Sequence, residues 1–315
     1  MEETSQQAPD EPTIPLSSLQ SLHPTTPSPG EGVHVTEGFH TSWDGRELFC
    51  RHWTGPRDSN ATVVLMHGYA EHSGRYHHVA TGLVEAGYDV RAIDARGHGR
   101  SPGVRGHIDR FEVFVRDLES VVQHCKSESS RPVFVVGHSH GGTIALRYAL
   151  MSPRDVAGFV VTSPFLGIAM QVPAPKRIAG ELMSRVWPTL AIPAGLDATY
   201  TCRDPQVVDH YVRDPLVFSS ATARWYTEVT RTHLELAQRA REIVAPCLFL
   251  VAGSDGLVDP DATRKVFSNV AADDRAMEVF EDAYHELLNE PNWTSFLAKI
   301  IDWLDARSSA KAVEK

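Results

Sequence analysis

The chain has 315 residues, of which 42% are hydrophobic and 22% are charged, a composition typical of a soluble globular protein. The net charge of −10 comes without any basic stripe that could meet phosphates, so we expect no nucleic-acid partner. Apolar runs stay well short of a membrane span, and no spanning helix is expected. The four cysteines show no paired spacing, which argues against a zinc site or a disulfide framework and favours a reducing, cytoplasmic location.

The N-terminal segment, residues 1–32, holds six prolines and several acidic residues but no lysine or arginine. Such a segment buries too little apolar surface to offset the entropy lost on ordering, so we predict a disordered tail. It also lacks the basic start and the continuous apolar core of a secretory signal. Residues 309–315 are predicted to form a short second tail.

Strands and helices alternate after the tail, beginning with two strands that a turn at Asp44-Gly45 joins. This alternation predicts an α/β fold with a mostly parallel sheet and helices on both of its faces. The predicted strands of this part are residues 33–40, 48–53, 61–66, 88–93, 132–136 and 156–162, with helices at 76–86, 111–122 and 143–150.

The alternation stops after the sixth strand. Residues 165–240 show no convincing strand, only helical patches that prolines interrupt, and then strands at 247–252 and 277–280 and two further helices follow. An insertion between two strands of an open sheet is expected over their carboxyl ends, where ligands bind in such folds. We therefore predict a core of residues 33–164 and 241–308, with a helical lid at 165–240.

The most informative motif is Gly137-His138-Ser139-His140-Gly141, an instance of G-x-S-x-G between a predicted strand and a predicted helix. A strand that turns abruptly into a helix needs glycines where Cβ atoms would clash, and it holds the serine in strained backbone with its hydroxyl exposed. The context predicts a nucleophile at Ser139. The alternative is an ordinary glycine-rich turn.

A serine hydroxyl needs a base to attack an ester, and the base needs a carboxylate to orient it. Asp255 follows the strand at 247–252, and His285 opens the loop after the strand at 277–280. Asp259 is interpreted as the cap of the next helix. The order Ser139, Asp255, His285, each residue just past a strand end, predicts a catalytic triad. The developing oxyanion would receive the backbone N–H groups of His140 and Tyr69.

Four segments carry a family resemblance: residues 67–76, 94–101, 137–142 and 283–290. Over residues 32–306 the chain resembles the α/β-hydrolase fold, specifically its monoacylglycerol lipase and lysophospholipase branch. The run from Glu71 to Tyr76 is the part that marks this branch. The resemblance implies a serine carboxylic-ester hydrolase that cleaves monoacylglycerol, a small lipid ester, through an acyl-enzyme without a metal or an organic cofactor.

The resemblance also implies which residues bind the substrate. Glu71 and Arg75 would build the polar end of the pocket for the glycerol group, and Tyr211 would reach the same group from the lid. His138 is expected to be a further substrate-binding residue. Two positions depart from the branch: His140, where methionine is usual, would make the pocket wall more polar, and Leu288 replaces a glycerol-contacting histidine of the animal enzymes.

Several alternatives stay open at this point. A lysophospholipase or a general short- or medium-chain esterase would use the same triad, and a non-catalytic binding protein could keep the fold. The Asp94–Ser101 segment is interpreted as a structural glycine loop, and a metal site built from His72, His77 and His78 is not favoured. The oligomeric state is not predicted.

The first part of the lid, between Pro164 and Pro193, mixes many apolar residues with Lys176, Arg177 and Arg185. These apolar residues either pack the lid onto the core or form a face that lies in a lipid interface. Because an apolar face with tryptophan and flanking basic residues is typical of interfacial helices, we expect weak, reversible contact with membranes.

Overall fold

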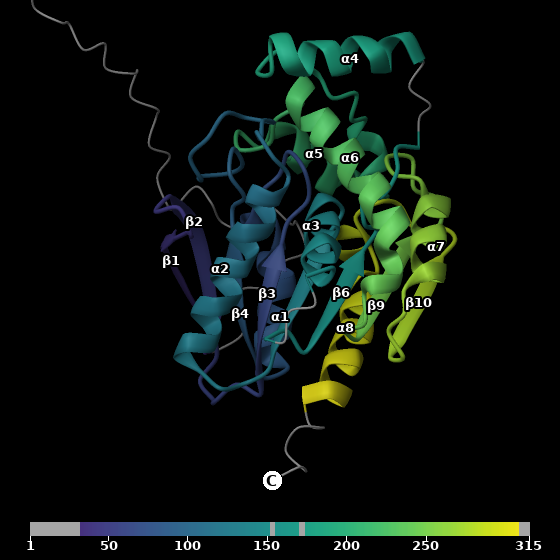
Figure 1. Cartoon of the computed structure of the whole chain (residues 1–315). Coiled ribbons are helices and arrows are strands. Elements are labelled where there is room, and N and C mark those ends of the chain that lie inside the picture. The colour runs from purple at the N-terminus through teal and green to yellow at the C-terminus, as the bar shows by residue number, and fades with distance from the viewer. Residues whose placement is uncertain (1–31, 152–154, 170–173, 309–315) are drawn as a thin grey trace, which may run out of the picture.

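The computed structural model describes residues 32–151, 155–169 and 174–308. The predicted tails, residues 1–32 and 309–315, lie outside this part of the chain except for Gly32. Within it, eight strands form one sheet in the order β1-β2-β4-β3-β5-β6-β9-β10 (Figure 1). The β1–β2 and β2–β4 pairs are antiparallel and the other pairs are parallel, as predicted. The strands are β1 (His34–Thr41), β2 (Glu47–Thr54), β3 (Ala61–Met66), β4 (Tyr88–Ile93), β5 (Val133–His138), β6 (Gly158–Thr162), β9 (Cys247–Ala252) and β10 (Arg275–Phe280).

Strand β3 shows how the core is divided between the two faces of the sheet. Val63 and Leu65 pack into one hydrophobic cluster with α1 and α8, whereas Val64 and Met66 pack into another with α2, α3 and α7. Because both faces are covered, the strand reads as a continuous apolar run. The helices of the two layers are α1 (His77–Glu85), α2 (Glu112–Glu128), α3 (His140–Ala149), α7 (Pro260–Asn269) and α8 (Trp293–Ser308) (Figure 1).

Between β6 and β9 the chain forms an inserted segment, residues 163–246, much of which lies beyond the carboxyl ends of the strands (Figure 1). The expectation of no strand in this region is wrong, because two strands of three residues pair there. They are too short for an alternating pattern, and one of them ends in a proline. The elements are α4 (Ala174–Val186), β7 (Ala191–Pro193), η3 (Ala198–Tyr200), α5 (Pro205–Arg213), β8 (Ser220–Thr222), α6 (Ala223–Arg239) and η4 (Ala240–Glu242).

The inserted segment is fastened to the core at several separate places. The backbone N–H of Phe218 donates to Ala70, 3.1 Å away, and the N–H of Glu286 donates to the carbonyl of Thr201 at 2.7 Å. The later part of α6 packs into the core, where Leu236 is fully buried. By contrast, α4 lies across the top of the molecule beyond α5 and α6 (Figure 1). These contacts hold the segment over one edge of the sheet.

The register of the parallel strands brings the loops at that edge together. Met66 pairs with Gly137, and Ala252 pairs with Phe280, so the loops after β3 and β5 begin at nearly the same level, as do those after β9 and β10, and all four loops leave the same edge of the sheet. The sequence predicted that Ser139, Asp255 and His285 would follow such strand ends. The edge under the inserted segment therefore gathers the loops that carry the predicted triad residues.

Candidate active site

Ser139 sits in strained backbone between β5 and α3, with φ 51° and ψ −116°. A Cβ atom on Gly137 would lie 2.5 Å from the carbonyl oxygen of Gly141, and a Cβ on Gly141 would overlap the carbonyl oxygen of Met66. Both flanking positions therefore require glycine, because the start of α3 packs directly against β5 and the end of β3. The predicted sharp turn at the serine is confirmed.

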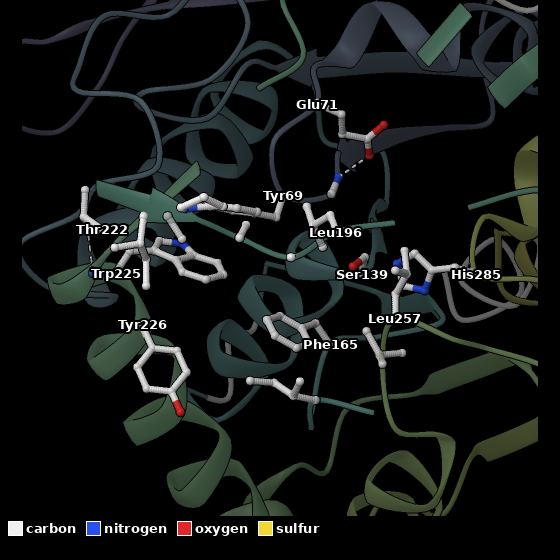
Figure 2. A pocket seen from close by; sticks show the side chains of 18 of the residues that line it. Tyr69, Glu71, Ser139, Phe165, Leu196, Thr222, Trp225, Tyr226, Leu257 and His285 are labelled. Carbon is white, nitrogen blue, oxygen red and sulfur yellow. Dashed lines mark hydrogen bonds between the residues drawn. The ribbon is translucent and has the colours of Figure 1, made fainter. Parts of the chain in front are cut away.

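Asp255 and His285 meet beside this turn. The Nδ1–H of His285 donates to Oδ2 of Asp255 at 2.6 Å, and both side chains are buried. The other carboxylate oxygen of Asp255 accepts the N–H groups of Leu257 and Val258 at 2.9 and 3.0 Å. Figure 2 shows the hydroxyl of Ser139 next to the His285 ring. The structure thus brings the three predicted triad residues together, and it places Asp259 at the N-terminus of α7 as the expected cap.

The pairing sets the charge states of both groups. Burial alone would lower the pKa of His285, but the charge and hydrogen bond of Asp255 outweigh it and raise this pKa above 6.5. Burial opposes ionisation of Asp255 too, but the charge and hydrogen bond of His285, with the two backbone N–H groups, hold its pKa below 3.8. The carboxylate is therefore charged at neutral pH and stabilises a protonated imidazole.

The two predicted oxyanion donors lie on neighbouring elements. The N–H of His140 belongs to the first turn of α3, where a helix has no internal acceptor for it. Tyr69 follows β3, in a loop that Glu71 fixes by accepting the N–H of Gly68 at 2.6 Å. The Tyr69 ring is held in turn by Trp225, with ring centroids 3.8 Å apart. Because α3 packs on the end of β3, the two N–H groups come from adjoining segments of backbone.

A cavity of about 540 Å³ opens above Ser139. Figure 2 shows Ser139, His285 and Glu71 toward one side of it and Trp225, Tyr226 and Phe165 toward the other. Most of its wall is apolar and comes from the inserted segment. The apolar lining includes Phe165, Ile168, Ala179, Met183, Leu190, Ile192, Leu196, Trp225, Tyr226, Leu257 and Val258.

The polar end of the cavity is built from a buried ion cluster. Arg75 forms an ion pair with Glu71 and a two-pronged pair with Glu286, donating from Nη1 at 2.8 Å and from Nη2 at 2.7 Å. The ring of Tyr211 covers the guanidinium, 4.7 Å from ring centroid to the guanidinium carbon. Glu71, Tyr211 and Glu286 line the cavity, whereas Arg75 stands behind them. Arg75 thus supports the polar end without lining it.

Comparison with known proteins places this chain in a family. Residues 57–292 match the family model described as "Serine aminopeptidase, S33". The monoacylglycerol lipase of Mycolicibacterium smegmatis is 34% identical over 80% of this chain and 90% of its own length. The crystal structure of the Paleococcus ferrophilus monoacylglycerol lipase is 32% identical, with a TM-score of 0.77 over 83% of this chain and 99% of that one. The chain belongs to the monoacylglycerol lipase branch of the α/β-hydrolase family.

A further relative is much longer. The uncharacterized abhydrolase domain-containing protein of Dictyostelium discoideum is 34% identical over 84% of this chain, but the match spans only 28% of that protein. The predicted family, the predicted fold and the assignment as a carboxylic-ester hydrolase are confirmed by these matches. The roles of single residues stay predictions.

The side chain of His140 does not lie where this branch suggested. Its ring packs edge-on against Phe111 and Phe114, with centroids 5.5 and 5.1 Å away, and it is not among the residues that line the cavity. The expected more polar pocket wall is therefore wrong. Because burial lowers the pKa of His140 well below 6.5, the imidazole is neutral and fits an aromatic cluster.

His138, Glu286 and Leu288 complete the surroundings of Ser139 and His285. His138 lines the cavity, with Nδ1 3.0 Å from the Thr162 hydroxyl, and burial lowers its pKa to about 4. Leu288 is buried away from the cavity lining, so it offers nothing in place of a glycerol-contacting histidine. Glu286 was missed by the sequence analysis, although its place directly after His285 on the same loop was a signal.

Two other predictions concern structure rather than chemistry. The carboxylate of Asp94 accepts the N–H groups of Ser73 and Arg100, both at 2.8 Å, so the glycine loop is structural as expected. The histidines considered for a metal have separate partners: His72 donates to Asp214, His77 accepts from Trp53, and His78 donates to the carbonyl of Leu288. No group of three or more His, Cys, Asp or Glu in the described residues is arranged to hold a metal ion.

Proposed function

We propose that this chain hydrolyses monoacylglycerols with Ser139, His285 and Asp255 as a catalytic triad. Ser139 Oγ attacks the ester carbonyl carbon while His285 Nε2 takes the hydroxyl proton. The N–H groups of Tyr69 and His140 stabilise the negative oxygen of the tetrahedral intermediate. The intermediate collapses, His285 hands its proton to the leaving glycerol oxygen, and the acyl chain stays on Ser139. Water, activated by His285, then releases the fatty acid.

One observation carries this proposal. A serine on a strained turn stands beside a buried His285–Asp255 pair at the wall of a cavity that has one polar and one apolar end. An acyl chain fits the apolar end, and a small hydroxylated alcohol fits the end formed by Glu71, Glu286 and Tyr211. Since the polar end is closed by a buried ion cluster, a second acyl chain has no room there. Monoacylglycerols should therefore be preferred to triacylglycerols.

The test is hydrolysis of monoolein and triolein by the wild-type chain and by Ser139→Ala. We expect monoolein to react faster than triolein, and the variant to lose several orders of magnitude in rate while staying folded. Ser254→Ala is the matched control, because Ser254 lies beside Asp255 but does not line the cavity. Faster turnover of triolein, or full activity of Ser139→Ala, would contradict the proposal.

We also propose that α4 touches lipid surfaces. Its outward face carries Ile178, Leu182, Val186 and, just beyond its end, Trp187, which are 64%, 54%, 70% and 59% exposed. The first three recur every four residues and so form one stripe. Arg177 and Arg185 are exposed near the two ends of the helix. Such a face suits reversible adsorption to a membrane surface, close to the residues Ala179 and Met183 that line the cavity.

No helix in the described ranges combines the length and the hydropathy that crossing a bilayer requires. Contact through α4 would therefore be peripheral. Its test is co-sedimentation of Ser139→Ala protein with phosphatidylcholine vesicles. Adding Val186→Glu and Trp187→Glu should abolish binding, whereas Val244→Glu, at an equally exposed site next to β9, should not. If the α4 substitutions do not affect binding, α4 only packs against the rest of the protein and does not contact lipid. We place the protein in the cytoplasm, since its cysteines are free thiols.

A further inference from the structure

The charged side chains of the cavity are unevenly distributed. Glu71 and Glu286 line it, and no lysine or arginine of the described residues does. The nearest cation, Arg75, is buried behind the two carboxylates, and its face is covered by the ring of Tyr211. A molecule that enters the polar end therefore meets carboxylate oxygens and a phenol, with no cation to meet an anionic group.

The other titratable groups that face this end do not cancel the negative charge. His138 is neutral at pH 7, because burial lowers its pKa to about 4. Burial disfavours the charged form of Glu286 also, but the Arg75 charge outweighs this and lowers its pKa to about 2, so it is ionised. His285 must be neutral to act as a base, and the charged Asp255 stands behind it. The polar end therefore carries net negative charge in the reactive state.

The carboxylates have room for donors. Glu71 accepts from Gly68, Tyr76 and Arg75, and Glu286 accepts twice from Arg75 and once from Asn289. Each carboxylate thus accepts three hydrogen bonds out of about four that its lone pairs allow. One acceptor position is left on each. Two neighbouring acceptors match an alcohol that offers two further hydroxyl groups or an ammonium group.

We propose that Glu286, together with Glu71, makes the site select its leaving group by charge. Neutral polyol esters and esters of ammonium-bearing alcohols are accepted, and esters whose alcohol carries a phosphate are rejected. The inference rests on the proposed ester hydrolysis at Ser139 and separates monoacylglycerols from lysophospholipids whose head group is a phosphate monoester. A phosphate monoester carries close to two negative charges at pH 7, and placing it against buried carboxylates costs far more than placing a hydroxyl there.

The experiment uses three oleoyl esters that differ in the group beyond the scissile bond. The alcohols are glycerol, 3-dimethylaminopropane-1,2-diol and glycerol 3-phosphate, and all are presented in the same neutral detergent micelles. The tertiary amine is protonated at pH 7 and cannot take the acyl chain. We expect kcat/KM of the phosphate ester to be at least about a hundredfold below that of the glycerol ester, and the ammonium ester to stay within about tenfold.

Two substitutions test whether Glu286 contributes to this selection. Glu286→Gln keeps the shape but removes one charge, and it should raise the phosphate-to-glycerol ratio of kcat/KM at least about tenfold. Glu290→Gln is the matched control: Glu290 is equally buried and pairs with Arg203, yet it does not line the cavity, so the ratio should not change. If Glu286→Gln fails to fold, the comparison of the three esters with the wild-type protein still tests the charge selection.

The outcomes distinguish failure of the charge selection from failure of the proposed ester hydrolysis. A phosphate ester within tenfold of the glycerol ester, or an ammonium ester a hundredfold slower than it, overturns the charge selection while leaving ester hydrolysis intact. If the phosphate-to-glycerol ratio of kcat/KM is unchanged in folded Glu286→Gln, Glu286 does not contribute to the selection. If no oleoyl ester is hydrolysed at all, the proposed function itself is wrong.

Discussion

His285 Nδ1 lies 2.6 Å from Asp255 Oδ2, although 30 residues separate them in the chain. The contact arises because β9 and β10 are parallel neighbours, so the loops that follow them start side by side. Asp255 is itself oriented by the N–H groups of Leu257 and Val258. With Nδ1 donating to the carboxylate, the neutral ring has its acceptor nitrogen, Nε2, free to take a proton from Ser139.

The first prediction concerns the acid. Asp255→Asn can keep the two backbone hydrogen bonds but presents an amide N–H to His285 Nδ1, which favours the wrong tautomer. We expect kcat with monoolein to fall about 10³- to 10⁴-fold. Asp259→Asn, which changes only the helix cap, should cost less than about threefold. A larger loss in Asp259→Asn would show that the acid is wrongly assigned.

The second prediction concerns pH. The pKa of His285 is raised above 6.5, because Asp255 favours the protonated ring more than burial disfavours it. Since the base must be unprotonated, kcat/KM should rise with pH through an inflection above 6.5. In Asp255→Asn the carboxylate is lost and burial remains, so the inflection of the residual activity should move to lower pH. An inflection that stays or moves upward would contradict the pairing.

The third prediction concerns strain at the nucleophile. Ser139 has φ 51° and ψ −116°, a conformation that side chains disfavour and glycine tolerates. Replacing it with alanine keeps the Cβ strain, whereas glycine relieves it. In urea denaturation we expect the free energy of unfolding of Ser139→Gly to be about 1 kcal/mol higher than that of Ser139→Ala. Both variants should be inactive. Equal or lower stability of the glycine variant would mean that the turn stores no strain.

The fourth prediction concerns the link between the core and the inserted segment. His72 donates from Nε2 to Asp214 Oδ2 at 2.8 Å, and both side chains are almost completely buried. Asp214→Ala leaves a buried imidazole without its acceptor, so we expect a loss of about 3 kcal/mol in the free energy of unfolding. Asp209→Ala removes only an exposed pair with Arg213 and should cost less than about 0.5 kcal/mol. Equal losses would contradict a buried link.

The sequence predicted the parts of the site that local patterns determine. The glycines around Ser139 and the strand ends before Asp255 and His285 are features of neighbouring residues, and parallel strands bring such ends to one edge. What it missed depends on partners far apart in the chain. Arg75 pairs with Glu286 across 211 residues, and no local signal places the cation behind the carboxylates.

The direction of a single side chain was equally hard to predict. His140 was expected in the pocket wall, but Phe111, Phe114 and Trp225 surround a space that its neutral ring fills. The short strands β7 and β8 pair only because the inserted segment folds back on itself, and three residues carry no periodicity. Each of these features comes from tertiary packing rather than from the order of residues nearby.

The most direct test of the central claim is peptide mapping after reaction with a fluorophosphonate, which traps an activated serine covalently. We expect a single adduct, on the peptide that contains Ser139, and loss of monoolein hydrolysis in proportion to labelling. Folded Ser139→Ala should give no adduct. An adduct on another serine, or monoolein hydrolysis that survives complete labelling of Ser139, would contradict it.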